Sequence, residues 1–94
     1  MVNWAEPAKK SLQQIYYFIS EDSKYFAKEV VEKIISESER LIDFPKLGRK
    51  VPEINDDNVR ELLIYSYRLI YEIGNDNINI LALIHSKMNF KGEI

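Results

Sequence analysis

Residues 67–84 read YRLIYEIGNDNINILALI and decide the fold of this chain. Residues 67–73 and 78–84 are rich in β-branched and aromatic side chains, which favour strands. The Gly-Asn-Asp-Asn sequence at 74–77 is typical of a turn that joins two antiparallel strands. The second of these strands is almost continuously apolar, so we expect it to be central in the sheet and covered on both faces.

The pattern before this hairpin changes at Pro45. Between Pro45 and the hairpin, residues 47–53 read as a loop, residues 55–58 as a polar turn and residues 59–65 as a further strand. Before Pro45, apolar residues recur every three or four positions, which predicts helices over 6–20 and 23–44. Pro7 suits the first turn of the first helix, and Ser23 suits the N-cap of the second.

The two ends of the chain carry weaker patterns. Val2-Asn3-Trp4 alternates apolar and polar residues, which is enough for a brief strand, whereas residues 86–94 indicate a ragged tail. Helices grouped before strands are typical of the α+β class rather than of a parallel βαβ sheet. We therefore expect one domain over 1–94, in which an N-terminal strand and a helical hairpin pack on a small, mainly antiparallel sheet.

Composition narrows the classes of function. The 94 residues include no cysteine, so disulfides and thiolate metal sites are excluded. No metal motif, phosphate loop or nucleotide fingerprint is present, and we expect no cofactor and no metal. The first residues lack a signal-peptide pattern, and no apolar run approaches the roughly 20 residues that span a bilayer. The expectation is a cytoplasmic protein without a membrane partner.

Charge argues weakly against nucleic acid as the partner. The chain has 13 basic and 15 acidic residues and a net charge of −2, whereas nucleic-acid binders usually carry a basic excess. The stretch 46–50 is locally basic, but it also reads as an ordinary solvated loop. The basic residues that we expect to contact a target or partner are Arg49, Lys50, Arg60 and Lys87.

Three motifs occur in order along the chain. They are LIDFPKLGR at 41–49 followed by Val51-Pro52-Glu53, then VREL at 59–62 leading into YRLIY at 67–71, and finally INILALIH at 78–85. In this order and spacing they resemble the RelE/ParE superfamily of type II toxins, which includes plasmid-stabilisation proteins. The resemblance covers nearly the whole chain, from Trp4 to about Lys87.

The resemblance implies a toxin that is neutralised by a cognate antitoxin. The long helical hairpin is more typical of ParE-like members, whose target is DNA gyrase. Other members of the superfamily are ribosome-dependent endoribonucleases that act on messenger RNA. A third alternative is a non-toxic module that only binds an antitoxin. The sequence leaves open whether the protein is an enzyme and whether it forms a homodimer or a hetero-oligomer with the antitoxin.

The nuclease alternative requires a base, an acid and a cation beside the scissile phosphate. Glu53, Arg68 and His85 are residue types that can fill these roles, and they lie near the matching motif positions. In the nuclease members the arginine of this motif stabilises charge on the phosphate. Arg68 also has a structural interpretation, in which its stem packs and its guanidinium pairs with an acid such as Glu61. His85 is the only histidine, and a lone histidine at a strand end is more often an ordinary core or edge residue than a catalyst.

Departures from the nuclease pattern favour the ParE-like interpretation. Nuclease members are typically strongly basic, and several end on a catalytic tyrosine. The nearest aromatic residue here is Phe90, which can stack on a base but cannot exchange a proton.

Aromatic residues gather where the two helices should meet. Five aromatics lie between positions 16 and 26, which is more than one helical stripe can bury. We expect one or two of them to be exposed and to contact a partner. The candidates are Tyr17, Tyr25 and Phe26.

Overall fold

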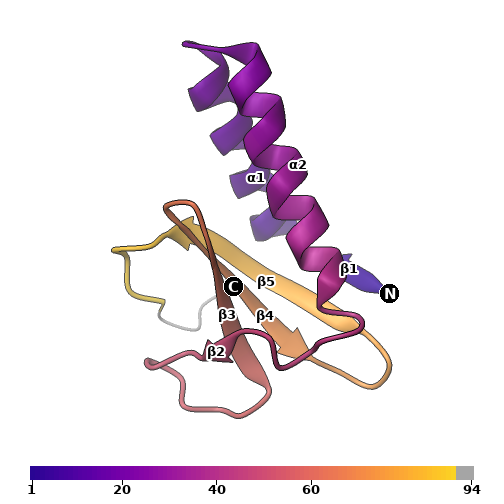
Figure 1. Ribbon diagram of the computed structural model, residues 1–94. Coiled ribbons are helices and arrows are strands. Elements are labelled where there is room, and N and C mark those ends of the chain that lie inside the picture. The colour runs from indigo at the N-terminus through magenta and orange to yellow at the C-terminus, as the bar shows by residue number, and fades with distance from the viewer. Residues whose placement is uncertain (91–94) are drawn as a thin grey trace.

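The computed structural model describes residues 1–90 and shows a helical hairpin above a five-stranded sheet (Figure 1). The strand order is β1-β5-β4-β3-β2, and β1 pairs with β5 in parallel while the other pairs are antiparallel. The predicted α+β class is thus confirmed. The elements are β1 (Val2–Trp4), α1 (Glu6–Ser20), α2 (Lys24–Arg40), β2 (Arg49–Lys50), β3 (Val59–Ile64), β4 (Tyr67–Ile73) and β5 (Ile78–His85).

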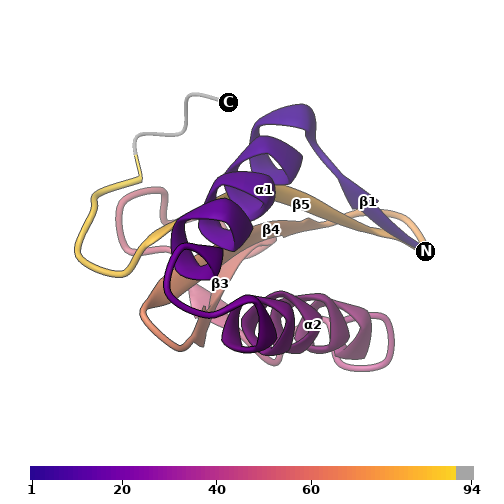
Figure 2. The same ribbon diagram turned by 90° about the horizontal axis from the view of Figure 1, so that it is seen from above.

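The two helices start where the sequence predicted. Ala5 is the N-cap of α1, with Pro7 in the first turn, and the Ser23 hydroxyl caps α2 by accepting a hydrogen bond from the Phe26 amide at 3.0 Å. Viewed from above, both helices lie over the sheet (Figure 2). The turn that joins them lies well away from the strands (Figure 1). Within residues 1–90, no helix is long and apolar enough to cross a bilayer.

The prediction that α2 runs to residue 44 is wrong, because the helix ends at Arg40. The Leu41 and Ile42 amides donate to carbonyls three residues back, at 3.2 Å each, so the chain tightens into a turn. This turn buries Leu41 completely among the core residues. Helical spacing alone could not distinguish a tight final turn from another turn of α-helix.

The strands differ from prediction at their ends and in number. β4 has its predicted bounds, β5 extends one residue further to His85, and β3 ends one residue earlier, at Ile64. Tyr65 has a φ of 54°, which is left-handed backbone in the turn between β3 and β4. The predicted loop at 47–53 contains β2, whose two residues pair with Arg60 and Glu61. Both residues of β2 are exposed, so no apolar alternation could reveal it.

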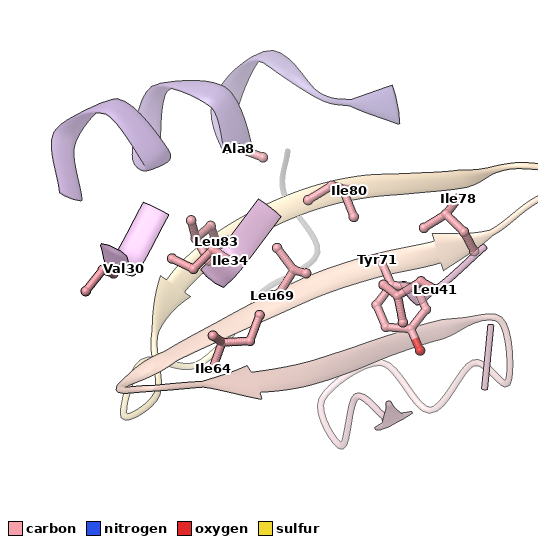
Figure 3. Close-up of a cluster of buried hydrophobic side chains, with 10 residues drawn as sticks. All are labelled: Ala8, Val30, Ile34, Leu41, Ile64, Leu69, Tyr71, Ile78, Ile80 and Leu83. Atoms are coloured by element: carbon pink, nitrogen blue, oxygen red, sulfur yellow. The ribbon is translucent and has the colours of Figure 1, made fainter. Parts of the chain in front are cut away.

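The main core lies between the helices and the sheet, where side chains from both layers point toward one another (Figure 3). Ile78, Ile80 and Leu83 of β5 face the helices. The residues of β5 that face the helices change from even-numbered to odd-numbered positions at a bulge opposite Ile70 and Tyr71. β5 is an interior strand, as expected, although β4 is the middle one. The opposite face of β5 is only half-buried, so the expectation of full cover on both faces is wrong.

A second, smaller core covers the face of the sheet away from the helices. Its buried residues are Val51, Val59, Ile70 and Phe90. Phe90 is 6% exposed, and the predicted ragged tail is therefore wrong for residues 86–90. The remainder of the predicted tail, 91–94, lies outside the described residues.

Candidate functional site

Arg68 stands at the centre of a polar cluster on the face of the sheet that carries the second core. It lies on β4 beside β3, and its side chain is 6% exposed. The Arg68 Nε–H donates to Glu61 Oε1 at 2.9 Å, and Nη2 donates to the same oxygen. The pairing with Glu61 that the structural interpretation required is therefore present.

The remaining donors of Arg68 hold two loop segments. Nη1 and Nη2 donate to the two carboxylate oxygens of Glu53 at 2.9 and 2.8 Å, and Nη1 also donates to the Met88 carbonyl at 2.6 Å. A guanidinium has five N–H groups, and these contacts use all five. In this conformation Arg68 has no donor left for a phosphate.

Glu61 is the second buried member of the cluster, and its carboxylate is shared between two cations. Glu61 is 1% exposed, and its Oε2 accepts a hydrogen bond from the Arg49 Nε–H at 2.7 Å. A carboxylate removed from water requires such compensation, because an unpaired buried charge is strongly unfavourable. The Arg49 side chain remains mostly exposed, so it closes the cluster at the surface.

Glu53 is held as an ionised carboxylate. Its hydrogen bonds from Arg68, followed in importance by one from the Phe90 amide at 2.9 Å, lower the pKa of Glu53 from 4.5 to about 2. The same carboxylate, followed by that of Glu61, raises the pKa of Arg68 above its ordinary value. A carboxylate with so low a pKa is a weak base, since efficient proton transfer requires a pKa near the working pH.

The three residues of the nuclease alternative do not share one cleft. A shallow recess of about 430 Å³ beside the cluster is lined by Arg49, Pro52, Glu53, Leu63, Arg68, Ser86 and Asn89. His85 is exposed at the end of β5, where its Nδ1 accepts a hydrogen bond from the Lys87 amide at 3.2 Å. Its ring also lies edge-on to Tyr67, with 6.3 Å between the ring centroids. The structure thus brings Glu53 and Arg68 together and leaves His85 outside the lining of their recess.

The four basic contact candidates have different surroundings. Arg60 is mostly buried and bridges two turns by donating to the Gly48 and Asp57 carbonyls, both at 2.9 Å, and to the Asp57 carboxylate. Arg49 pairs with Glu61, as described above. Lys50 and Lys87 are exposed, and neither has an ion-pair partner within residues 1–90.

A buried tyrosine that sequence reasoning missed positions the loop before β2. The Tyr71 hydroxyl donates to the Pro45 carbonyl at 2.6 Å and accepts from the Gly48 amide at 3.0 Å. A Cβ at Gly48 would lie 2.3 Å from the Glu61 carbonyl oxygen, so this position requires glycine. The signal in the sequence was a polar aromatic in an apolar strand, which usually needs a hydrogen-bond partner when buried.

The aromatic surface at the tip of the hairpin is larger than predicted. Tyr17, Phe18, Tyr25 and Phe26 are all 50–75% exposed, whereas only one or two exposed aromatics were expected. Phe18 was not among the contact candidates, although it belongs to the same run of aromatics. We call these four residues the tip surface.

A helical hairpin packed on a five-stranded mixed sheet is the fold of the ParE toxins. The chain belongs to the ParE toxin family, because the model described as "ParE toxin of type II toxin-antitoxin system, parDE" matches residues 2–90. No curated protein sequence matches the chain significantly.

Two solved structures share this fold. A chain from the chromosomal ParDE toxin-antitoxin system of P. aeruginosa is 19% identical; the alignment covers 92% of this chain and 95% of that chain, with a TM-score of 0.74. A chain from the heterotetrameric YoeB-YefM toxin-antitoxin complex of Staphylococcus aureus is 14% identical; 90% of this chain and 94% of that chain are covered, with a TM-score of 0.59.

Proposed function

We propose that this ParE-type toxin inhibits DNA gyrase and is neutralised by a cognate antitoxin. Membership of the ParE family supports the toxin class, and gyrase is the target that the resemblance implies. The observation that carries the choice against messenger cleavage is the state of Arg68. Its five donors are all used within the protein, so it offers no charge-stabilising contact to a scissile phosphate.

Two further features support this choice. The ionised Glu53 carboxylate is a poor base, and His85 does not line the recess that Glu53 and Arg68 share. Phe90, at the position nearest to the terminal tyrosine of nuclease members, is buried in the second core and not free to stack on a base. A net charge of −2 adds little general attraction to ribosomal RNA.

His85→Gln tests the target, because it removes the only histidine while changing an exposed side chain. We expect induced wild type and His85→Gln to arrest growth equally, with intact ribosome-bound messenger, and both purified proteins to block gyrase supercoiling. Sequencing of ribosome-bound messenger and a supercoiling assay measure the two activities separately. In a nuclease, loss of a positioned acid would instead reduce cleavage by roughly 100- to 10,000-fold.

The outcomes separate all three functions. Site-specific messenger breaks that disappear with His85→Gln would overturn the gyrase proposal in favour of the nuclease. A folded protein that binds an antitoxin but leaves growth, messenger and gyrase unaffected would be the non-toxic module. Arg68→Ala is unsuitable for this test, because its buried position means that loss of activity would report loss of folding.

The proposed antitoxin needs an exposed surface of the toxin to which it can bind. On the helical hairpin, the tip surface is the strongest candidate for this binding surface. We propose that an antitoxin segment, disordered alone, folds across the hairpin and the sheet. Exposed aromatics are the side chains that most often dominate such interfaces. The core does not require these aromatic side chains, because Ala27, Val30 and Ile34 already form the buried face of α2.

Replacing Tyr17, Tyr25 and Phe26 together by serine is expected to weaken the antitoxin complex by about 1–4 kcal/mol in sum. Isothermal titration of the purified toxin with its antitoxin would measure this loss. The matched control is Phe44→Ser, a similarly exposed aromatic just after the end of α2, at the opposite end of the hairpin from the tip surface. Unchanged affinity of the triple variant would place the antitoxin elsewhere.

A further inference from the structure

Tyr65 occupies a backbone conformation that aromatic residues rarely adopt. Ile64 pairs with Tyr67, so Tyr65 and Ser66 form the whole loop between β3 and β4. Loops this short need a positive φ, which glycine, asparagine and aspartate supply most readily, and the φ of Tyr65 is 54°. For other L-residues the left-handed conformation lowers the folding equilibrium by roughly fivefold or more.

The other left-handed residues of the chain follow the usual preference. Within residues 1–90, the residues other than glycine that have a positive φ are Asn55, Tyr65 and Asp76. Asparagine and aspartate tolerate this conformation, because their short polar side chains can bond to the nearby backbone. Tyr65 is the exception, and a glycine or asparagine would form the same loop more readily. Local folding therefore gives no reason for a tyrosine at this position.

The Tyr65 side chain contributes little to the packing of the domain. It is 57% exposed and belongs to neither of the two cores. Its ring borders a groove of about 360 Å³ against α2, whose charged lining residues Lys33, Glu37 and Arg40 pair with one another. An unfavourable backbone conformation together with an exposed side chain is typical of functional positions, where stability is lost in favour of a contact.

Tyr65 lies at the end of the sheet at which β5 also ends (Figure 1). The Ser66 carbonyl accepts a hydrogen bond from the Ser86 amide at 2.8 Å, which holds the segment after β5 beside this loop. That segment exposes Lys87 and Met88, and Met88 is 58% exposed. Exposed aromatic and apolar side chains with polar neighbours are typical of a surface that contacts another protein.

We propose that Tyr65 is a target-contact residue of this toxin and that its ring enters an apolar pocket on the target protein. A cognate antitoxin is specialised for its toxin, so its own sequence can adapt to an unstrained loop. The target is not specialised for the toxin, so the unfavourable residue has to be on the toxin. A net charge of −2 disfavours a nucleic acid as the partner.

The identity of the target as gyrase rests on the proposed function. The role of Tyr65 rests on its conformation and its exposure, and it would hold for another protein target of the toxin.

The test compares Tyr65→Asn and Tyr65→Gly with Phe44→Asn, which removes an aromatic of similar exposure from a position without a positive φ. Both Tyr65 variants should unfold at a temperature roughly 4 °C above that of wild type, because removal of the left-handed tyrosine shifts the folding equilibrium roughly fivefold. They should nevertheless require roughly tenfold more protein to inhibit gyrase supercoiling by half, the loss expected when an interface anchor is truncated.

The control variants separate the ring from the backbone. Phe44→Asn should gain no stability and should inhibit gyrase like wild type. Tyr65→Phe keeps both the ring and the strained conformation, so it should be no more stable than wild type and should inhibit almost as well. Isothermal titration should give the same antitoxin affinity for all these variants.

Several results would overturn the proposal. Lower stability of both Tyr65 variants would show that the ring serves folding, and unchanged inhibition would show that the target does not contact it. Weaker antitoxin binding with unchanged inhibition would assign the ring to the antitoxin. Messenger cleavage by wild type that the Tyr65 variants lose would assign the ring to a nucleobase.

Growth arrest provides a measurement that does not depend on the identity of the target. Arrest by wild type without gyrase inhibition and with intact messenger would refute only the proposed target, and weaker arrest by Tyr65→Asn would still support the contact role. Gyrase inhibition that is equal in wild type and Tyr65→Asn would refute this inference alone.

Discussion

Arg68→Ala is expected to lower the free energy of unfolding by about 3–5 kcal/mol, the loss that follows when one partner is removed from a buried ion pair. The substitution leaves the Glu61 carboxylate buried with only Arg49 beside it, and it frees Glu53 and the Met88 carbonyl from their shared donor. Urea unfolding followed by circular dichroism at neutral pH measures the difference.

The matched control for this substitution is Arg60→Ala, which removes the same side chain from the neighbouring strand. The partners of Arg60 are backbone carbonyls and the exposed Asp57, so we expect a loss of about 1 kcal/mol. Arg68→Lys should recover only part of the lost stability, because an ammonium group cannot reproduce the planar fork that spans Glu53 and Glu61. Equal losses for the Arg68 and Arg60 alanine variants would contradict the structural role of Arg68.

The sequence predicted those parts of the fold in which apolar residues recur at a regular spacing or a turn motif is present. The apolar spacing of α1 and α2 and the turn at 74–77 placed both helices and the β4–β5 hairpin, because these patterns arise from which faces must be buried. β2 was missed because its residues are exposed on both faces and only its backbone pairing defines it. The early end of α2 was missed because burial of Leu41 in a tighter turn satisfies the same apolar spacing.

The candidate site was predictable to a similar extent. The pairing of Arg68 with Glu61 follows from strand alternation, because the register places Leu63 opposite Arg68 and Glu61 two residues along on the same face. Glu53 and the backbone of Met88 and Phe90 also contribute to the cluster. They lie in loop segments whose sequences show no regular apolar spacing, so their contacts could not be predicted. Only the folded structure shows that these segments converge on one guanidinium and change its role from a possible phosphate ligand to an internal anchor.

Phe90→Ala is expected to destabilise the protein by about 3 kcal/mol, the lower end of the range for truncating a buried phenylalanine. The Phe90 ring packs with Val51, Val59 and Ile70, and the Phe90 amide donates to Glu53 at 2.9 Å. Urea unfolding would measure the loss, with Phe44→Ala as control, because Phe44 is 58% exposed and its removal should change stability by about 0.5 kcal/mol or less. If Phe90 instead served to stack on a nucleobase, Phe90→Ala would be as stable as wild type while messenger cleavage fell. A loss of stability confined to Phe90→Ala, with messenger intact in cells that express either variant, would support a structural role for the Phe90 ring in the second core.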